Sequence, residues 1–157
     1  MEKRHLFGLW ILIQTYENYF DDTLQIKTFK DFKRWFGEKV IDGLVGVSIE
    51  TGEIIGCAYI DNLENNNGRL NVFMKWKAMD FSDMINLFKE YLGFFLDKHN
   101  LKMLYGVVRV DNKACIQILK RLNFKINTDI LTAHEYVNNK PIDCLIATYS
   151  RNYGVLK

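Results

Sequence analysis

The sequence has little of several residue types, and each shortage excludes a class of protein. One proline and ten glycines in 157 residues exclude a collagen-like chain and a disordered one. The cysteines, Cys57, Cys115 and Cys144, are odd in number, lie far apart and include no Cys-x-x-Cys pair. Neither a disulfide scaffold nor a zinc site built on thiolates is expected, and the reducing cytoplasm is the expected location.

Net charge and long apolar runs are also scarce. The 21 basic and 19 acidic residues nearly cancel to +2, so neither a nucleic-acid partner nor a charged membrane surface is expected. No apolar stretch approaches the roughly 18 residues of a membrane span. The apolar run near the start lacks a small-residue cleavage pattern and is interpreted as part of the fold. The three histidines show no metal-ligand spacing, so no metal site is expected.

Hydrophobic residues, in contrast, make up 48% of the chain, enough for a substantial core. No linker, repeat or low-complexity segment interrupts the sequence, and we expect one domain spanning 1–157. The first forty residues give the least clear pattern. Residues 7–13 are a candidate first strand, and the stretch 16–36 favours two helices, with 31–40 amphipathic.

A meander of three antiparallel strands is expected next. Residues 44–49 and 54–60 are typical of strands joined by a turn at 50–53, and the Asn-rich segment 64–68 is typical of another turn. From 69 to 76, apolar and polar residues alternate with the period of two that a third strand requires.

The period then changes to that of an amphipathic helix. Its apolar stripe consists of Met84, Leu87, Phe88, Tyr91, Leu92, Phe95 and Leu96. Asp80 or Ser82 is expected to cap its start, because their oxygens can accept free backbone N–H groups. Residues 103–110 form an apolar run typical of a strand buried on both faces. Asn112 is expected to cap a second helix that ends at Asn123.

Two last strands, 131–137 and 142–149, flank a turn at 138–141. The predicted fold is therefore a mixed α/β domain with one central sheet. Its parts are an antiparallel meander, a crossover helix, a buried strand, a helix and a terminal hairpin, with helices on both faces.

The segment 110–125 carries a family resemblance. Asn112 and Cys115, then a helix, then Asn123 and Phe124, resemble the second conserved segment of the GNAT N-acetyltransferase superfamily, which reads Asn-x-x-Ser/Ala, helix, Gly-Phe. Asn123 stands in place of the glycine. The order of elements over about 44–150 is similar to that family as well.

The resemblance implies acetyl-coenzyme A as a cosubstrate, with its pyrophosphate at the start of the helix that follows the third strand. Free N–H groups and the helix dipole attract an anion at such a place. The implied binding residues there are Lys77, Ala78, Met79, Asp80 and Ser82. Asp80 and Ser82 take the places of the family's two glycines, so the loop is degenerate. If the segment is only a helix cap, coenzyme binding is weak or absent.

The same resemblance implies further contacts with the coenzyme. Backbone N–H groups of the strand centred on Val72, Phe73 and Met74 would polarise the thioester carbonyl. Asn112 either caps its helix alone or also faces the pantetheine arm. Cys115 lies at the matching position of the same helix and is otherwise an inert buried residue.

Acetyl transfer to an amine needs an acceptor for the amine proton, a donor to the oxyanion and a proton for the leaving thiolate. Leu119 occupies the position of the tyrosine that many family members use as the acid. His134 and Tyr136, on one face of their strand, are the predicted catalytic residues. An amino terminus, with a pKa of about 7.7–8.0, needs no strong base. The full set of base candidates is Asp61, Glu64, His134, Glu135 and Tyr136.

The sequence thus predicts an acetyl-coenzyme A-dependent N-acetyltransferase. It would move an acetyl group to a primary amine, on a protein amino terminus or a small molecule, by direct transfer in a ternary complex. The alternative is a catalytically inactive GNAT-fold protein that serves as a binding or assembly module. The degenerate loop and the missing acid favour that alternative. A homodimer is left open, and the identity of the amine is not specified.

Overall fold

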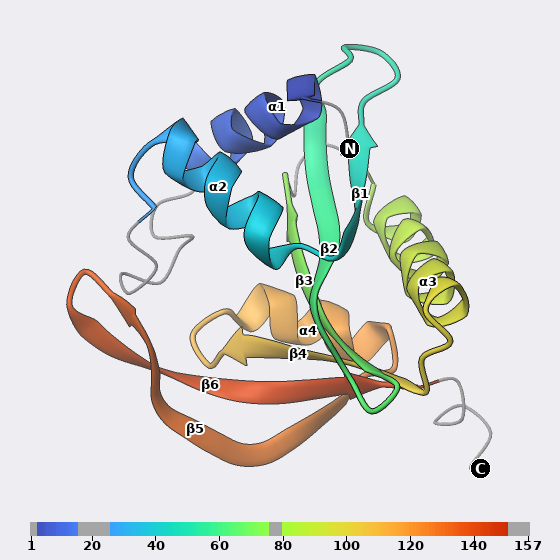
Figure 1. Cartoon of the computed structure of the whole chain (residues 1–157). Coiled ribbons are helices and arrows are strands. Elements are labelled where there is room, and N and C mark those ends of the chain that lie inside the picture. Colours follow the sequence, from blue (N-terminus) through green and yellow to red (C-terminus); the bar gives the residue numbers. More distant parts are fainter. Residues whose placement is uncertain (1–2, 16–25, 76–79, 151–157) are drawn as a thin grey trace.

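The computed structural model describes residues 3–15, 26–75 and 80–150. These residues form four helices and six strands (Figure 1). In chain order they are α1 (Lys3–Gln14), α2 (Phe29–Lys39), β1 (Asp42–Val47), β2 (Ile54–Glu64), β3 (Asn67–Met74), α3 (Phe81–Lys98), β4 (Met103–Arg109), α4 (Lys113–Arg121), β5 (Lys125–Val137) and β6 (Lys140–Tyr149).

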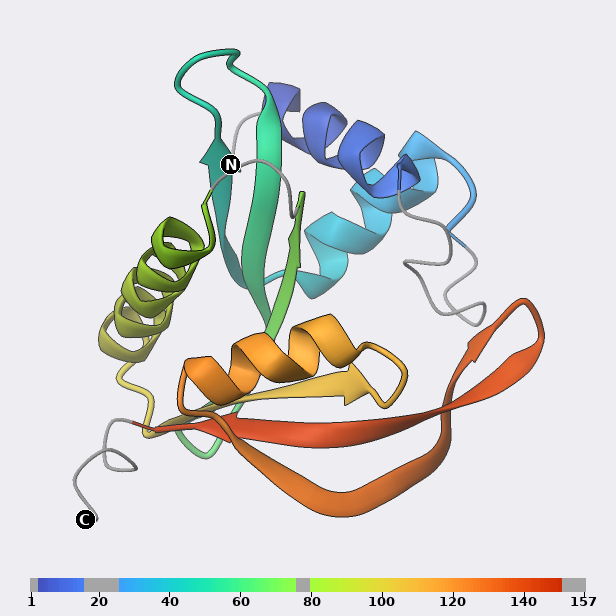
Figure 2. The same cartoon turned by 180° about the vertical axis from the view of Figure 1, so that it is seen from behind.

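All six strands belong to one sheet in the order β1-β2-β3-β4-β6-β5. Only β3 and β4 pair in parallel, with α3 as the crossover between them, and the other neighbours are antiparallel. The mixed sheet predicted from the sequence is therefore confirmed. Figures 1 and 2 show its two halves, β1–β3 and β4–β6, running in clearly different directions.

Each face of the sheet carries its own apolar core. On one face, α3 and α4 pack through residues such as Phe88, Phe95 and Ile118 onto Ile60 and Leu104. On the other face, α1 and α2 pack onto the alternate side chains of β2 and β3. That second core contains Leu9, Leu12, Ile13, Phe32, Phe36, Cys57, Tyr59 and Phe73. Helices on both faces were predicted, and this prediction is confirmed.

The predicted first strand at 7–13 is wrong, because these residues belong to helix α1. Leu9, Leu12 and Ile13 recur at helical spacing and are buried, whereas Phe7 and Ile11 are each 52% exposed. A nearly continuous apolar run fits a buried strand and a buried helix equally well by pattern. Contact with α2 and β2 decides in favour of the helix.

The sequence also misplaced the strand that is buried on both faces. In β4 only Leu104 and Val108 are fully buried. In β2 every residue from Ile55 to Ile60 is buried, because β2 lies between the α1–α2 core and the α3 core. β5 begins at Lys125, six residues before the predicted start at 131.

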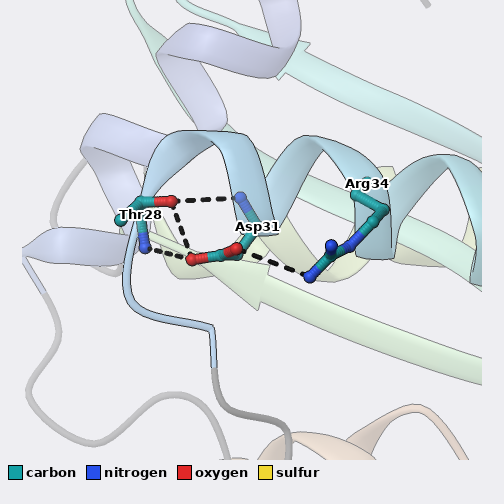
Figure 3. A network of polar contacts seen from close by, with 3 residues as sticks. All are labelled: Thr28, Asp31 and Arg34. Carbon is teal, nitrogen blue, oxygen red and sulfur yellow. Dashed lines mark hydrogen bonds and ion pairs between the residues drawn. The ribbon is translucent and has the colours of Figure 1, made fainter.

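The predicted Asn-rich turns are confirmed, and one helix start shows a cap that was not predicted. Helix α2 begins with a capping box, shown in Figure 3: the Thr28 hydroxyl accepts from the backbone N–H of Asp31, and the Asp31 carboxylate accepts from the backbone N–H of Thr28. The hydrogen bonds from Thr28 lower the pKa of Asp31. The two predicted Asn-rich hairpin turns place their asparagines, at 65–66 and 138–139, at positive φ.

A partly buried carboxylate joins the end of α3 to the start of β1. One oxygen of Asp42, Oδ2, lies 2.8 Å from Lys98 Nζ and 2.9 Å from His99 Nε2. Burial raises the pKa of Asp42, but the hydrogen bonds from Lys98 and His99 outweigh this effect, and the net pKa lies below its usual value of 3.8. This contact fixes α3 against the edge of the sheet.

The Asp42→Asn substitution should lower the free energy of unfolding by about 1–3 kcal/mol near neutral pH, because the Lys98 ammonium and the His99 ring lose a charged acceptor. The folded-state pKa of Asp42 is lower than the unfolded value. Its contribution is therefore complete above pH 3.8 and is lost as the pH falls through the folded-state pKa. Thermal unfolding at pH 7 and at pH 2–3 measures this, and the difference between wild type and variant should shrink at the lower pH. Glu90→Gln, an exposed carboxylate on α3, is the control. An equal difference at both pH values would contradict the assignment.

Candidate active site

The central feature of the candidate site is the early separation of β3 and β4. Their parallel ladder has only three residue pairs, from Asn67 with Met103 to Arg69 with Tyr105. Beyond it, β3 continues beside β2, and β4 continues beside β6. At Gly106 the strands are still close, since a Cβ there would lie 3.1 Å from the carbonyl oxygen of Leu70. The sheet therefore opens immediately after these residues.

Val72, Phe73 and Met74, the predicted partners of the thioester, lie on the part of β3 that follows the separation. Val72 and Met74 pack toward the core under α3, and Phe73 packs toward α1 and α2. The side chains therefore anchor β3 in both cores. The backbone of this stretch pairs with β2 on one edge and faces the opening on the other.

The first turn of α3 holds the described part of the predicted phosphate site. Lys77, Ala78 and Met79 lie outside the described residues. Asp80 is the N-cap residue of α3, as expected, but its side chain makes no capping hydrogen bond. Asp80 and Ser82 are both exposed.

A cation from α4 reaches the same turn of α3. The guanidinium carbon of Arg121 lies 5.5 Å from the centre of the half-exposed ring of Phe81. Asp83 adds a negative charge in this turn. The start of α3 therefore combines a helix terminus without a side-chain cap, two carboxylates and one guanidinium.

The start of α4 has the predicted local geometry. Asn112 is its N-cap residue, and its Oδ1 accepts a hydrogen bond of 3.1 Å from the backbone N–H of Cys115. Asn123 follows the end of α4 with a φ of +63°, as the sequence predicted. Leu119 packs against the core, so the position of the family's tyrosine is apolar and partly buried.

The cysteines are free thiols. Burial raises the pKa of Cys57 to about 12 and that of Cys115 to about 11, so both thiols stay protonated at neutral pH and are poor nucleophiles. Within 3–15, 26–75 and 80–150, no three His, Cys, Asp or Glu side chains gather to bind a metal ion. None of the helices in these ranges has the length and apolar character needed to cross a bilayer.

His134 and Tyr136, the predicted catalytic residues, are both exposed on β5, and Tyr136 is 41% exposed. Glu135 between them is half-buried and lies opposite Ile142. Just before this stretch the strand is irregular: Ala133 has a φ of +50°, and its N–H donates to Asp143 Oδ1 at 2.9 Å. Figures 1 and 2 show the tip of this hairpin bending toward the side of the molecule that carries α1 and α2.

Asp61, another candidate base, is engaged by an arginine. Arg69 binds its carboxylate with two hydrogen bonds, from Nε at 2.7 Å and from Nη2 at 2.8 Å, and the Asp61 side chain is only 8% exposed. Beside this pair, Asn62 donates to the hydroxyl of Tyr105 at 3.0 Å. The two contacts join β2, β3 and β4 at the last residue pair before the sheet opens.

Sequence reasoning missed two residues near the opening. Arg121 was not singled out, because its proximity to Phe81 depends on how α4 packs. Asn71 was seen only as one polar position in the alternation of β3. In the structure its amide nitrogen is buried, and no described residue offers it a hydrogen-bond partner. Such a group costs about 1–3 kcal/mol, and the only sequence signal was a polar residue among the apolar ones of a central strand.

No protein-family model matches the sequence, and no curated protein matches it. Solved structures do match. Mutant forms of the spermidine/spermine N-acetyltransferase SpeG from Vibrio cholerae give a TM-score of 0.79 at 13% identity, covering 99% of this chain and 93% of the other. A dodecameric spermidine N-acetyltransferase from Vibrio cholerae gives 0.78 at 12% identity, covering 99% and 94%. The ribosomal-protein-S5-alanine acetyltransferase from Vibrio fischeri gives 0.66 at 14% identity, covering 80% and 73%. The chain has the fold of these acetyltransferases, and the predicted GNAT fold is confirmed.

The Asp61→Asn substitution should lower the free energy of unfolding by about 1–3 kcal/mol, because it removes the charge of a carboxylate that is mostly buried and bound by Arg69 in a bidentate ion pair. Chemical denaturation at neutral pH measures this effect. Glu53→Gln is the matched control, since Glu53 and Lys75 form a single, exposed contact at 3.5 Å that should contribute no more than about 1 kcal/mol. Equal effects of the two substitutions would show that the Asp61–Arg69 pair does not hold β2 and β3 together.

Proposed function

We propose that this chain transfers an acetyl group from acetyl-coenzyme A to a primary amine. The observation that carries the proposal is the opening between β3 and β4, with the start of α3 following β3. An extended pantetheine arm needs a gap between strands whose backbone edge is unpaired. A pyrophosphate needs a helix terminus with available N–H groups. The fold of the solved acetyltransferases is consistent with this function.

In the proposed complex, the pantetheine arm occupies the opening between β3 and β4. Backbone N–H groups of Val72, Phe73 and Met74 would donate to the thioester carbonyl oxygen and stabilise its developing negative charge. Asn112 and Cys115, at the start of α4, would line the arm. Asn112 would then have both roles foreseen for it, since its cap bond is present in the structure.

The reaction would be a direct transfer. The amine nitrogen forms a bond to the thioester carbon, the carbon–sulfur bond breaks with its electron pair remaining on sulfur, and the proton lost by the amine finally neutralises the thiolate. Holding both substrates in one complex supplies much of the rate by proximity. An amine with a pKa near 8 is partly unprotonated at neutral pH and requires little help from a base.

The start of α3 would hold the pyrophosphate of the coenzyme. Lys77, Ala78, Met79, Asp80 and Ser82 are the proposed phosphate-binding residues. Three features support them: a helix terminus without a side-chain cap, the exposure of Ser82, and the Arg121 guanidinium above Phe81. The carboxylates of Asp80 and Asp83 oppose an anion.

Ser82→Glu should abolish acetyl-coenzyme A binding without unfolding the protein. A carboxylate in the first turn stabilises a helix through its dipole but repels phosphate at the same place. The measurement is thermal unfolding with and without acetyl-coenzyme A near millimolar concentration. Wild type should show a higher midpoint with the ligand, because a ligand that binds only the native state stabilises it. The Ser82→Glu variant should show no such shift.

Asn86→Glu, which places the same charge on an exposed position one turn later in α3, is the matched control and should retain the shift. Asp80→Gly removes the repelling carboxylate and should enlarge it. If wild-type protein shows no shift, the enzyme proposal is wrong. The second candidate would then take its place: a GNAT-fold binding or assembly module without catalysis. The two carboxylates at the start of α3 are the observation that favours this candidate.

His134 and Tyr136 are the proposed proton-transfer residues, and both are exposed. His134→Gln or Tyr136→Phe should lower kcat by about 100-fold for whichever residue moves the proton, with loss of one limb of the pH–rate profile. The unfolding midpoints should not change, because both side chains are exposed. Thr132→Val, at another exposed position of β5, is the control. Unchanged kcat in both variants would show that the amine loses its proton without these residues.

Two further proposals concern the setting of the protein. Three free thiols suit a reducing cytoplasm. Self-association as a homodimer is proposed by analogy with a structural neighbour that is described as dodecameric. Sedimentation of the purified chain measures it directly.

A further inference from the structure

We infer that Asn71 determines which amine the protein acetylates, by binding an oxygen atom of the acceptor. The inferred acceptor is an α-amino-acyl compound, with a carbonyl or carboxylate oxygen next to its amine. This inference rests on the proposed acetyltransferase function. Its basis is a buried amide nitrogen on β3 for which the described residues provide no partner.

Asn71 lies on the face of the sheet that α1 and α2 partly cover. It is directly opposite Tyr59 in the antiparallel ladder of β2 and β3. Residues opposite each other share a face, and Tyr59 belongs to the core beneath α1 and α2. Phe73, two residues further along β3, belongs to the same core. The side chain of Asn71 therefore points away from α3 and α4.

Asn71 also lies at the point where the sheet opens. Arg69 is the last residue of β3 that pairs with β4, and Leu70 points into the opposite core. Asn71 is thus the first residue on the α1–α2 face after the separation. The stretch Val72–Met74, proposed to hold the thioester carbonyl, begins immediately afterwards. An amine that attacks this carbonyl from the α1–α2 face would bring its substituents next to Asn71.

The chemistry of the unpartnered group selects the ligand. Buried amide groups are nearly always hydrogen-bonded in native proteins, and a donor left without an acceptor is retained at a cost in stability. The nitrogen of Asn71 can only donate. A protonated alkylamine or polyamine offers no acceptor, whereas a carbonyl or carboxylate oxygen does.

Two further features agree with an oxygen ligand. Asn71 as a whole is half-buried, so part of the residue is open to contact. Arg69 lies two residues before Asn71 on the same face and is 44% exposed. Its guanidinium carries five N–H donors, and one on Nε and one on Nη2 bind Asp61. The donors of Arg69 and Asn71 together favour an oxygen-bearing acceptor.

Binding provides a test that does not require turnover. Leucinamide and 3-methylbutylamine share a side chain and differ by the carboxamide. With coenzyme A present, leucinamide should shift the side-chain NH2 signals of Asn71 in a ¹⁵N-correlated NMR spectrum, and 3-methylbutylamine should not. The signals are assigned by their loss in Asn71→Leu. Leucine in place of leucinamide shows whether a carboxylate is bound as well as a carbonyl. Equal shifts with both amines, or no shift with leucinamide and leucine, would overturn the inference.

Kinetics test the same point in the complete reaction. The ratio of kcat/KM for leucinamide to that for 3-methylbutylamine should fall by about tenfold or more in Asn71→Leu and in Asn71→Asp, which keeps the size but loses the donor. Comparing this ratio in the variants with that in wild type cancels the effect that the different pKa values of the two amines have on the rates. Gln117→Leu, which removes an exposed amide on α4, is the control and should leave the ratio unchanged.

The unfolding midpoint separates a binding role from a structural one. Because the amide nitrogen has no partner to lose, Asn71→Leu should not lower the midpoint in the absence of ligands. A ratio unchanged by both Asn71 variants overturns the inference while leaving the acetyltransferase proposal intact. Absence of acetyl transfer to every amine overturns the acetyltransferase proposal, and the NMR result then decides alone whether Asn71 binds an oxygen ligand.

Discussion

The separation of β3 from β4 after three residue pairs is the constraint on which the rest of the structure depends. A continuous parallel ladder would bury the backbone edges of both strands and leave no room between them. The separation is possible because each half of the sheet is stabilised elsewhere. β3 is held by a long antiparallel ladder with β2 and by two cores, and β4 is held by β6 and by the core beneath α3 and α4.

Close backbone packing and two polar contacts fix the positions of β2, β3 and β4 where β3 and β4 separate. Gly106 allows the carbonyl of Leu70 to approach closely before the strands part. The Asp61–Arg69 pair and the Asn62–Tyr105 bond tie the three central strands together one residue earlier. Polar contacts at this position cost little, because Arg69 remains half-exposed while Asp61 receives two good hydrogen bonds. The part of the site that lies on β3 and β4 is therefore placed on strands that are held in the sheet.

Much of the fold could be predicted because its signals are local. The stripe of α3, the Asn112 cap and the Asn-rich hairpin turns depend on residues close together in the sequence, and all appear as expected. Helix α1 could not be predicted in this way. Its apolar run lacks a period that separates strand from helix, and packing against α2 and β2 decides the outcome.

The candidate site was less predictable than the fold. A sequence motif can indicate Asn112 or the start of α3, because helix capping and anion binding both occur at the first turn of a helix. It cannot indicate that Arg121 on α4 reaches Phe81 on α3, or that the amide of Asn71 is buried without a partner. Both facts depend on tertiary contacts between distant segments. The engagement of Asp61 by Arg69 likewise became visible only once the register of β2 and β3 was known.

The irregularities of the outermost strands have a consequence for the behaviour of the protein in concentrated solution. β1 and β5 form the two edges of the sheet, and an edge with a regular row of N–H and C=O groups can template pairing with another molecule. The register of β1 shifts between Gly46 and Val47, and that of β5 shifts twice, near Ala133 in the second case. Each shift interrupts the row of hydrogen-bonding groups. Although β5 is a long, partly apolar edge strand, its irregular backbone should therefore lower its tendency to pair with a strand of another molecule.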